Sequence, residues 1–202
     1  MDNNTRTNSD STPLKLAVIV ASNREGRFAP VLAEWFRGRL AEHADFAVDF
    51  VDLAEVELPT ALSHRPDAAV RAELAKVSPV LDAADAFVVL TPEYNHSFPA
   101  SLKALIDWHF VEWQAKPVGF VSYGGMSGGL RAVEQLRQVF AEMHAVTVRD
   151  TVSFHNAHGD FDEDGRHKGS TGPDAAAKSL LDQLAWWAHA LRDAKAVRPY
   201  AA

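Results

Sequence analysis

The chain has 202 residues, of which 47% are hydrophobic and 23% are charged, so it is long enough to bury a hydrophobic core. It contains no cysteine, which excludes disulfides, thiolate metal sites and a cysteine nucleophile, and any redox chemistry must therefore use a bound cofactor. The formal net charge of −7, without a block of Lys or Arg, argues against a nucleic-acid partner.

The sequence carries no signal for export or membrane insertion. It has no long apolar run, and its polar first residues, MDNNTRTNSDSTP, lack the apolar stretch of a signal peptide. We therefore expect a cytoplasmic protein with no membrane partner. Residues 1–13 are expected to form a disordered leader, and residues 14–202 a single domain.

Short apolar runs alternate along the chain with segments of helical periodicity. The run LKLAVIVAS (14–22) is typical of a central parallel strand, and the helix after it accepts Pro30 in its first turn. Further strands are expected at 46–53, 85–91, 117–123 and 145–152, and helices at 30–40, 66–84 with an interruption near Pro79, 101–108, 128–143 and 173–194. Five strands alternating with five helices predict an α/β fold with a doubly wound parallel sheet and helices on both faces. In such a sheet ligands bind at the carboxyl ends of the strands, so the loops there are the candidate site.

The loop after the first strand, ASNREGRFAP (21–30), leads directly into a helix. Its Ser22, Asn23, Arg24 and Arg27 add side-chain donors to the free N–H groups of a helix N-terminus, which favours an anionic ligand. With one glycine, Gly26, and no Walker lysine, the loop suits a terminal monophosphate better than a dinucleotide bridge. The alternative is a polar turn whose arginines are solvated.

The loop after the third strand, TPEYNHSFP (91–99), is predicted to be rigid. Two prolines restrict it, Asn95 tolerates unusual φ, and Ser97 is available to cap the next helix. Backbone groups of such a loop can bind the edge of a flat heterocycle while Tyr94 packs beside it. The alternative is a structural turn in which Tyr94 and Phe98 cover the core and His96 meets solvent.

The loop after the fourth strand, SYGGMSGG (122–129), has four glycines in eight residues. Either a ligand approaches its backbone closely or the chain needs positive φ there. Residues 125–129 also match G-x-S-x-G, which would make Ser127 the nucleophile of a hydrolase. Three residues separate the strand from that motif and no HGGG-type loop is present, so the hydrolase is a remote alternative.

The segment after the fifth strand, residues 155–172, contains a partial calcium-binding pattern. Asp160, Asp162, Asp164 and Gly165 match the start of an EF-hand loop, but Thr171 stands where the loop needs Glu. We therefore expect no metal site, and a charged surface loop that could cover the cleft as a lid.

Residues 91–107, TPEYNHSFPASLKALID, closely resemble the signature T-P-E-Y-N-x-S-x-P-x-x-L-K-N-A-I-D of the NADPH-dependent FMN reductase family. This family includes azoreductase-like and chromate-reductase-like quinone reductases. The resemblance covers residues 14–155, and Ala104 stands where the family has Asn. The first loop is similar to the family's G-S-x-R-x-x-S-x-N phosphate loop, although Ala21, Arg27 and Ala29 replace its Gly, Ser and Asn.

The resemblance implies a flavodoxin-like sheet of order 2-1-3-4-5 and an FMN site made of the three loops. Pro92, Glu93, Tyr94 and Asn95 would line the isoalloxazine, with His96 and Ser97 bordering its open face. The other implied cofactor-binding residues are Ser22, Asn23, Arg24, Arg27, Phe28, Ser122, Tyr123, Gly124 and Gly125.

The implied function is that of a flavin-dependent NAD(P)H oxidoreductase. NADPH or NADH would pass a hydride to N5 of FMN, and a quinone, azo compound, metal ion or free flavin would take the electrons in a ping-pong cycle. No protein group need be catalytic, because FMN carries the chemistry. A non-catalytic FMN-binding carrier or sensor is the alternative. Family members form homodimers or homotetramers, and Trp108, Phe110 and Trp113 could serve such an interface or the core.

Overall fold

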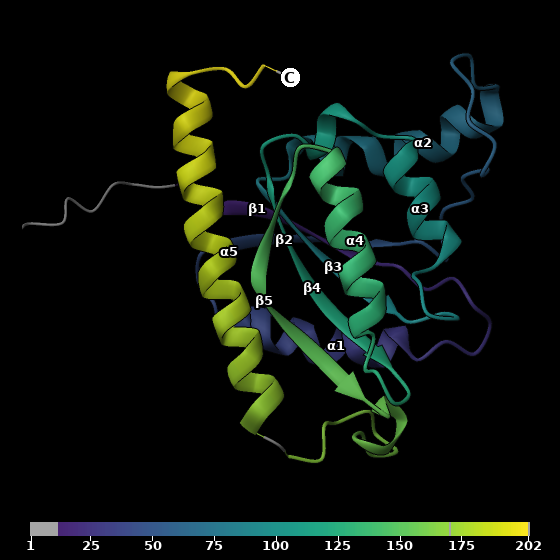
Figure 1. Cartoon of the computed structure of the whole chain (residues 1–202), viewed down its shortest axis with the longest axis vertical. Coiled ribbons are helices and arrows are strands. Elements are labelled where there is room, and N and C mark those ends of the chain that lie inside the picture. Colours follow the sequence, from purple (N-terminus) through teal and green to yellow (C-terminus); the bar gives the residue numbers. More distant parts are fainter. Residues whose placement is uncertain (1–11, 170, 202) are drawn as a thin grey trace, which may run out of the picture.

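The computed structural model describes residues 12–169 and 171–201, so the predicted leader falls almost entirely outside the described residues. Its strands form one parallel sheet of order β2-β1-β3-β4-β5, which confirms the predicted order (Figure 1). The elements are β1 Leu14–Val20, α1 Ala29–Ala41, β2 Phe46–Asp52, α2 Ala68–Ala83, β3 Ala86–Pro92, α3 Ala100–Asp107, η1 Val111–Trp113, β4 Pro117–Gly124, α4 Leu130–Glu142, β5 Val146–His155, η2 Ala157–Gly159 and α5 Thr171–Val197.

Helices cover both faces of the sheet. Leu32 and Phe36 of α1 and Leu180 of α5 belong to one buried cluster, whereas Leu81 of α2 and Leu105 of α3 belong to a second cluster on the other face, together with residues of α4. The central strands β1 and β3 are buried almost throughout, as their continuous apolar runs predicted. Two hydrophobic layers thus hold the sheet and fix the ends of its strands.

The predicted interruption of the second helix near Pro79 is wrong. Helix α2 runs from Ala68 to Ala83 with Pro79 inside it. A proline removes one hydrogen bond, here to the carbonyl of Ala75, but both residues lie on the exposed face, where water can satisfy that carbonyl. Burial of Val77 and Leu81 on the opposite face maintains the helix.

The last strand of the sheet, β5, is irregular. Its pairing with β4 shifts, because Val118 lies opposite Thr147 whereas Phe120 lies opposite Thr151. Arg137 of α4 reaches this stretch and donates hydrogen bonds of 2.8 Å to the Val148 carbonyl and 3.0 Å to the Arg149 carbonyl. The guanidinium therefore satisfies carbonyls that the distorted ladder leaves free.

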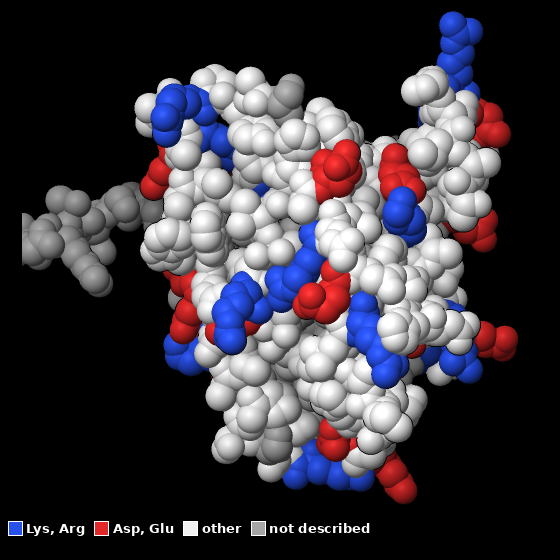
Figure 2. All heavy atoms as spheres, in the orientation of Figure 1, with Lys and Arg blue, Asp and Glu red and all other residues white. Residues whose placement is uncertain are grey.

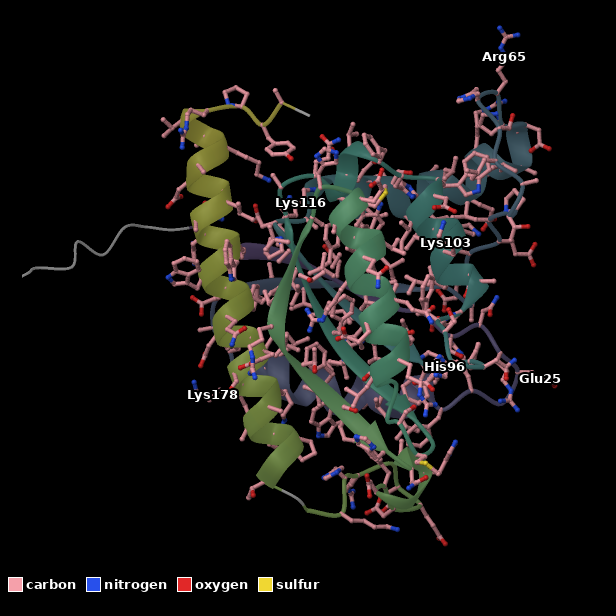
Figure 3. All side chains as sticks on the ribbon, viewed as in Figure 1. Glu25, Arg65, His96, Lys103, Lys116 and Lys178 are labelled. Carbon is pink, nitrogen blue, oxygen red and sulfur yellow. The ribbon has the colours of Figure 1, made fainter. Side chains whose placement is uncertain are left out.

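The parallel strands bring the predicted loops to one edge of the molecule. Figure 3 shows Glu25 of the first loop and His96 of the third on the same side, with Lys116, which precedes β4, toward the other end of the strands. On the face shown in Figure 2, basic and acidic side chains are interspersed and no basic patch is visible. None of the described helices combines the length and apolarity that a membrane span requires.

Candidate functional site

The loop before α1 offers hydrogen-bond donors that the described part of the chain does not use. Phe28 occupies the N-cap position of α1 without a side-chain cap, and the N–H groups of residues 23–26 have no acceptor among the described residues. The exposed Arg24 has no ion-pair partner there either. Unpaired amides at a helix N-terminus beside a free guanidinium are suited to an anion such as a phosphate.

Arg27, the second arginine of this loop, is already engaged. It forms a bidentate ion pair with Asp52 at the end of β2, with one bond of 2.6 Å, and donates a 2.7 Å bond to the Ser22 carbonyl. Partial burial alone would raise the pKa of Asp52, but the hydrogen bonds from Arg27 and from the Ala54 N–H, together with the charge of Arg27, outweigh it and lower this pKa below its ordinary value. Arg27 therefore braces the loop against β2, a role that the sequence did not reveal because Asp52 lies far along the chain.

Phe28 contacts the segment that follows β5. Its ring centroid lies 4.5 Å from that of His158, 5.4 Å from Phe161 and 6.0 Å from Tyr123. The predicted surface loop thus packs against the loop before α1. Its aspartates bond locally, since the Asp162 carboxylate accepts from the Arg166 N–H at 2.7 Å, and the described residues contain no cluster of side chains suited to a metal.

The third loop contains a tight turn over residues 94–97. The Tyr94 N–H donates to the Ser97 carbonyl at 2.8 Å, and the Ser97 N–H donates to the Tyr94 carbonyl at 3.0 Å. Asn95 and His96 between them have φ of 49° and 74°, the left-handed region that non-glycine residues rarely adopt. Their N–H groups find no acceptor in the described structure, so the strained turn presents two free donors.

Contacts to neighbouring elements fix this turn in place. Gln135 of α4 donates to the His96 carbonyl at 2.8 Å and accepts from the Ser97 hydroxyl at 2.6 Å. The Tyr94 hydroxyl lies 2.5 Å from that of Ser22, which links the turn to the loop before α1. The prediction that Ser97 caps α3 is wrong, because its hydroxyl serves Gln135 and α3 begins after Pro99 without a side-chain cap.

The fourth loop uses its glycines for two purposes. Gly128 and Gly129 have positive φ, and a Cβ at either would lie within 2.6 Å of Ser153 or Ser122 atoms, so the chain itself requires them. Around Gly125, by contrast, a Cβ would meet nothing within 4 Å. The Gly125 carbonyl accepts from the N–H groups of Gly128 at 3.3 Å and Asn156 at 3.0 Å, whereas its own N–H has no acceptor among the described residues and is open to a ligand beside the end of β4.

The remaining predicted residues lie where β3 and β4 end side by side. Pro92 pairs with Tyr123, and burial raises the pKa of the Tyr123 hydroxyl well above its ordinary value. Glu93 follows, with only 8% of its side chain exposed, and binds Arg131 at 3.0 Å. The side chain of Ser122 is fully buried and donates to the Gly128 carbonyl at 2.9 Å, whereas Gly124 is half-buried.

Ser127 does not have the surroundings of a hydrolase nucleophile. Burial alone would raise the pKa of Glu93, but hydrogen bonds from Ser127 and Arg131 outweigh it and lower this pKa below its ordinary value. The Ser127 hydroxyl thus interacts with the Glu93 carboxylate, and within the described residues it has no histidine partner. Moreover, α4 begins only at Leu130, so the strand–turn–helix geometry of the nucleophile elbow is absent from this loop.

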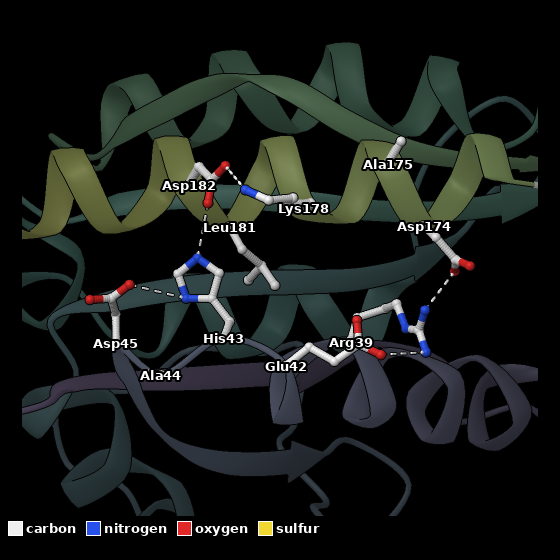
Figure 4. A pocket seen from close by; sticks show the side chains of 10 residues that line it. All are labelled: Arg39, Glu42, His43, Ala44, Asp45, Asp174, Ala175, Lys178, Leu181 and Asp182. Atoms are coloured by element: carbon white, nitrogen blue, oxygen red, sulfur yellow. Dashed lines mark hydrogen bonds and ion pairs between the residues drawn. The ribbon is translucent and has the colours of Figure 1, made fainter.

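A separate groove of about 510 Å³ lies between the end of α1 and the first half of α5 (Figure 4). His43 lies in it between Asp45, at 3.3 Å, and Asp182, at 3.2 Å, and Arg39 pairs with Asp174 at 3.2 Å. Asp45 directly precedes β2, so this groove lies at the amino end of the strands, away from the three loops. Its charged groups pair across the helices and stabilise their packing.

The structure superposes on the solved structures of a flavoenzyme and of a flavodoxin. The flavoenzyme NAD(P)H:(acceptor) oxidoreductase FerB of Paracoccus denitrificans superposes with a TM-score of 0.68 at 18% identity, over 88% of this chain and 98% of that one. A flavodoxin of Pseudomonas aeruginosa superposes with a TM-score of 0.53 at 18% identity, over 87% and 99% of the two chains. At this identity the similarity establishes the flavodoxin-like fold.

Sequence comparisons extend the similarity to family level. Residues 14–159 match the family described as NADPH-dependent FMN reductase. An NAD(P)H-dependent FMN reductase of Saccharomyces cerevisiae is 33% identical over 143 residues, 62% of this chain and 73% of the relative. An FMN-dependent NADPH-azoreductase of Staphylococcus saprophyticus is 28% identical over 151 residues, 71% and 78% of the two chains. The chain therefore belongs to the NADPH-dependent FMN reductase family.

Proposed function

We propose that the chain is an NAD(P)H-dependent oxidoreductase that binds FMN at the carboxyl ends of β1, β3 and β4. One observation carries the proposal: all three loops present unused donors or open backbone at the same edge of the sheet. These are the amides of residues 23–26 with Arg24, the amides of Asn95 and His96, and the N–H of Gly125. This pattern fits a molecule with an anionic end and a flat heterocyclic end.

The donors divide by chemistry between the two ends of FMN. Arg24 and the amides at the start of α1 would hold the phosphate, whose negative charge the helix dipole also favours. Asn95, His96 and Gly125 would bind the ring edge through their backbone, because the turn and the glycine leave those groups accessible. Arg27 would act indirectly, by fixing the loop.

When bound, FMN supplies the chemistry by accepting a hydride from NAD(P)H and passing electrons to an acceptor. The protein's task is then to hold the ring and control access to it. His96 and Met126 are exposed at the margin of the site, Met126 by 87%, and would limit what approaches the ring. The relatives named for FMN, azo compounds and 2-hydroxy-1,4-benzoquinone support a small electron-accepting molecule as the second substrate.

The chain is further proposed to associate as a homodimer or homotetramer. Of the aromatic residues after α3, Trp113 is fully buried in the core and Trp108 is half-buried with its Nε1 donating to the Pro59 carbonyl at 2.8 Å. Phe110 is 51% exposed and Val111 is 65% exposed. These two adjacent side chains form an apolar surface suited to a partner copy.

To test this, the visible spectrum of the purified protein is recorded with added FMN. NADPH or NADH is then added without oxygen, and a quinone is added last. We expect binding, bleaching of the flavin band near ~450 nm and rapid reoxidation. Binding without bleaching would instead indicate a carrier or sensor. Absence of FMN binding would contradict the proposal.

Arg24→Ala tests the phosphate contact. Loss of a charge-assisted hydrogen bond should weaken FMN binding about tenfold to a hundredfold, measured as Kd by flavin fluorescence. Arg65→Ala is the matched control, since Arg65 is also exposed but lies at the tip of a distant projecting loop (Figure 3). Equal FMN affinity of the two variants would remove Arg24 from the site.

A further inference from the structure

A second groove, of about 530 Å³, opens beside the phosphate loop. We call it the β2–α2 groove: its walls are the segment 53–60, Val70 of α2 and the first turn of α3, and Asn23 of the phosphate loop borders it. Its volume lies within the range of small-molecule sites. The groove therefore continues from the proposed FMN phosphate site toward α2.

The walls of this groove are preformed. The Glu57 N–H donates to the Glu73 carboxylate at 2.9 Å, Lys76 donates to the Glu55 carbonyl at 3.3 Å, and the Trp108 indole donates to the Pro59 carbonyl at 2.8 Å. These bonds tie three points of the segment 53–60 to α2 and to the end of α3. Little ordering of this segment would be needed on binding, which favours affinity.

The chemistry of the walls selects a flat, partly apolar ligand. Leu53, Val56, Leu58 and Pro59 provide apolar surface on one side, and Val70 provides it on another. Glu57 is among the residues that line the groove; it is exposed, and its carboxylate has no partner among the described residues. No Lys or Arg lines it, and Lys76 close by is paired with Glu73 at 2.7 Å.

We infer that the β2–α2 groove binds the adenosine half of the hydride donor and makes the enzyme prefer NADH to NADPH. The inference rests on the proposed function. An adenine ring suits the apolar walls, and the Glu57 carboxylate can accept hydrogen bonds from ribose hydroxyls. A 2′-phosphate would instead meet the unpaired Glu57, and no Lys or Arg is among the residues that line the groove.

The first experiment compares kcat/KM for NADH and NADPH. We expect wild-type protein to favour NADH about tenfold or more, and Glu57→Arg to shift that ratio toward NADPH by a similar factor. Glu55→Gln and Glu57→Gln form the matched pair, because both remove one charge from the same segment but only Glu57 lines the groove. Only Glu57→Gln should reduce the preference for NADH. A ratio that neither Glu57 variant moves would overturn the inference.

The second experiment measures binding without turnover. ADP-ribose, which lacks nicotinamide, should bind FMN-loaded protein in calorimetry, and Val70→Trp, which fills the groove, should weaken it at least tenfold. Val70→Trp should leave the Kd for FMN unchanged, which also verifies that the variant folds. Undiminished ADP-ribose binding by Val70→Trp would contradict the inference. If neither dinucleotide reduces bound FMN, the proposed function fails, and the ADP-ribose result still decides whether the groove binds adenosine.

Discussion

Gln135 provides the clearest test at the scale of single residues. Both ends of its amide hold the strained turn 94–97, through the His96 carbonyl and the Ser97 hydroxyl. Gln135→Met keeps the size of the side chain but removes both bonds, so Asn95 and His96 should relax away from their left-handed conformation. We expect FMN binding to weaken about tenfold, with a shift in the flavin reduction potential.

The control for this variant lies one turn along the same helix. Gln138→Met makes the same chemical change at an exposed position of α4. Gln135→Glu, which retains an acceptor for Ser97 but not the donor to His96, should give an intermediate Kd. Identical potentials and affinities for Gln135→Met and wild type would show that the turn holds its shape alone.

Local signals allowed part of the site to be predicted from sequence. Asn95 was expected to adopt an unusual φ and does so at 49°, since this preference is intrinsic to the residue. The ion pair of Arg27 with Asp52 was not predicted. Contacts of Gln135 with residues nearly forty positions away were likewise missed. Contacts between residues far apart in the chain depend on how the strands and helices pack together, and local sequence patterns do not predict that packing.

At the scale of elements, Lys116 ties the start of β4 to the end of α2. Lys116 is only 7% exposed, and its ammonium donates to the Leu81 and Asp82 carbonyls, which the helix end leaves free. Burial lowers the pKa of Lys116 from 10.5 to about 8. Between these values the unfolded chain binds more protons than the folded one, so the free energy of unfolding must rise with pH.

The prediction is a pH-dependent difference between wild type and Lys116→Met. Wild type should gain stability over the variant from about pH 8 to about pH 10, by at most ~1.4 kcal/mol per pH unit, in denaturant unfolding. Lys15→Met, at an exposed position of β1, should show no such trend relative to wild type. A constant difference across this range would mean that Lys116 titrates normally.

Periodicity predicted every strand and α-helix, because buried runs and amphipathic faces repeat over many residues. Two details of the helices were predicted wrongly. Pro79 was expected to interrupt a helix that tertiary packing keeps intact. Helix α5 runs to Val197, past the predicted end at residue 194. The prediction ended too early because the last turns of the helix lack the apolar spacing of the earlier ones.

At the scale of the whole molecule, the proposed assembly can be tested directly. Light scattering should give a mass of two or four copies of the 22.1 kDa chain. Phe110→Ser combined with Val111→Ser should reduce it toward one copy, because the exposed apolar pair is lost. Trp186→Ser, at a 64% exposed position of α5, is the control and should not change the mass. A monomeric wild type would contradict the assembly.

The distorted stretch of β5 also limits how copies can meet. An exposed, regular edge strand is a template for a strand from another molecule, and continued pairing of this kind leads to aggregates. Here Arg137 occupies two carbonyls of the last strand, and the register shift beside them breaks the repeat that an incoming strand would need. The β5 edge is therefore a poor template for an incoming strand, and we expect no extension of the five-stranded sheet at this edge.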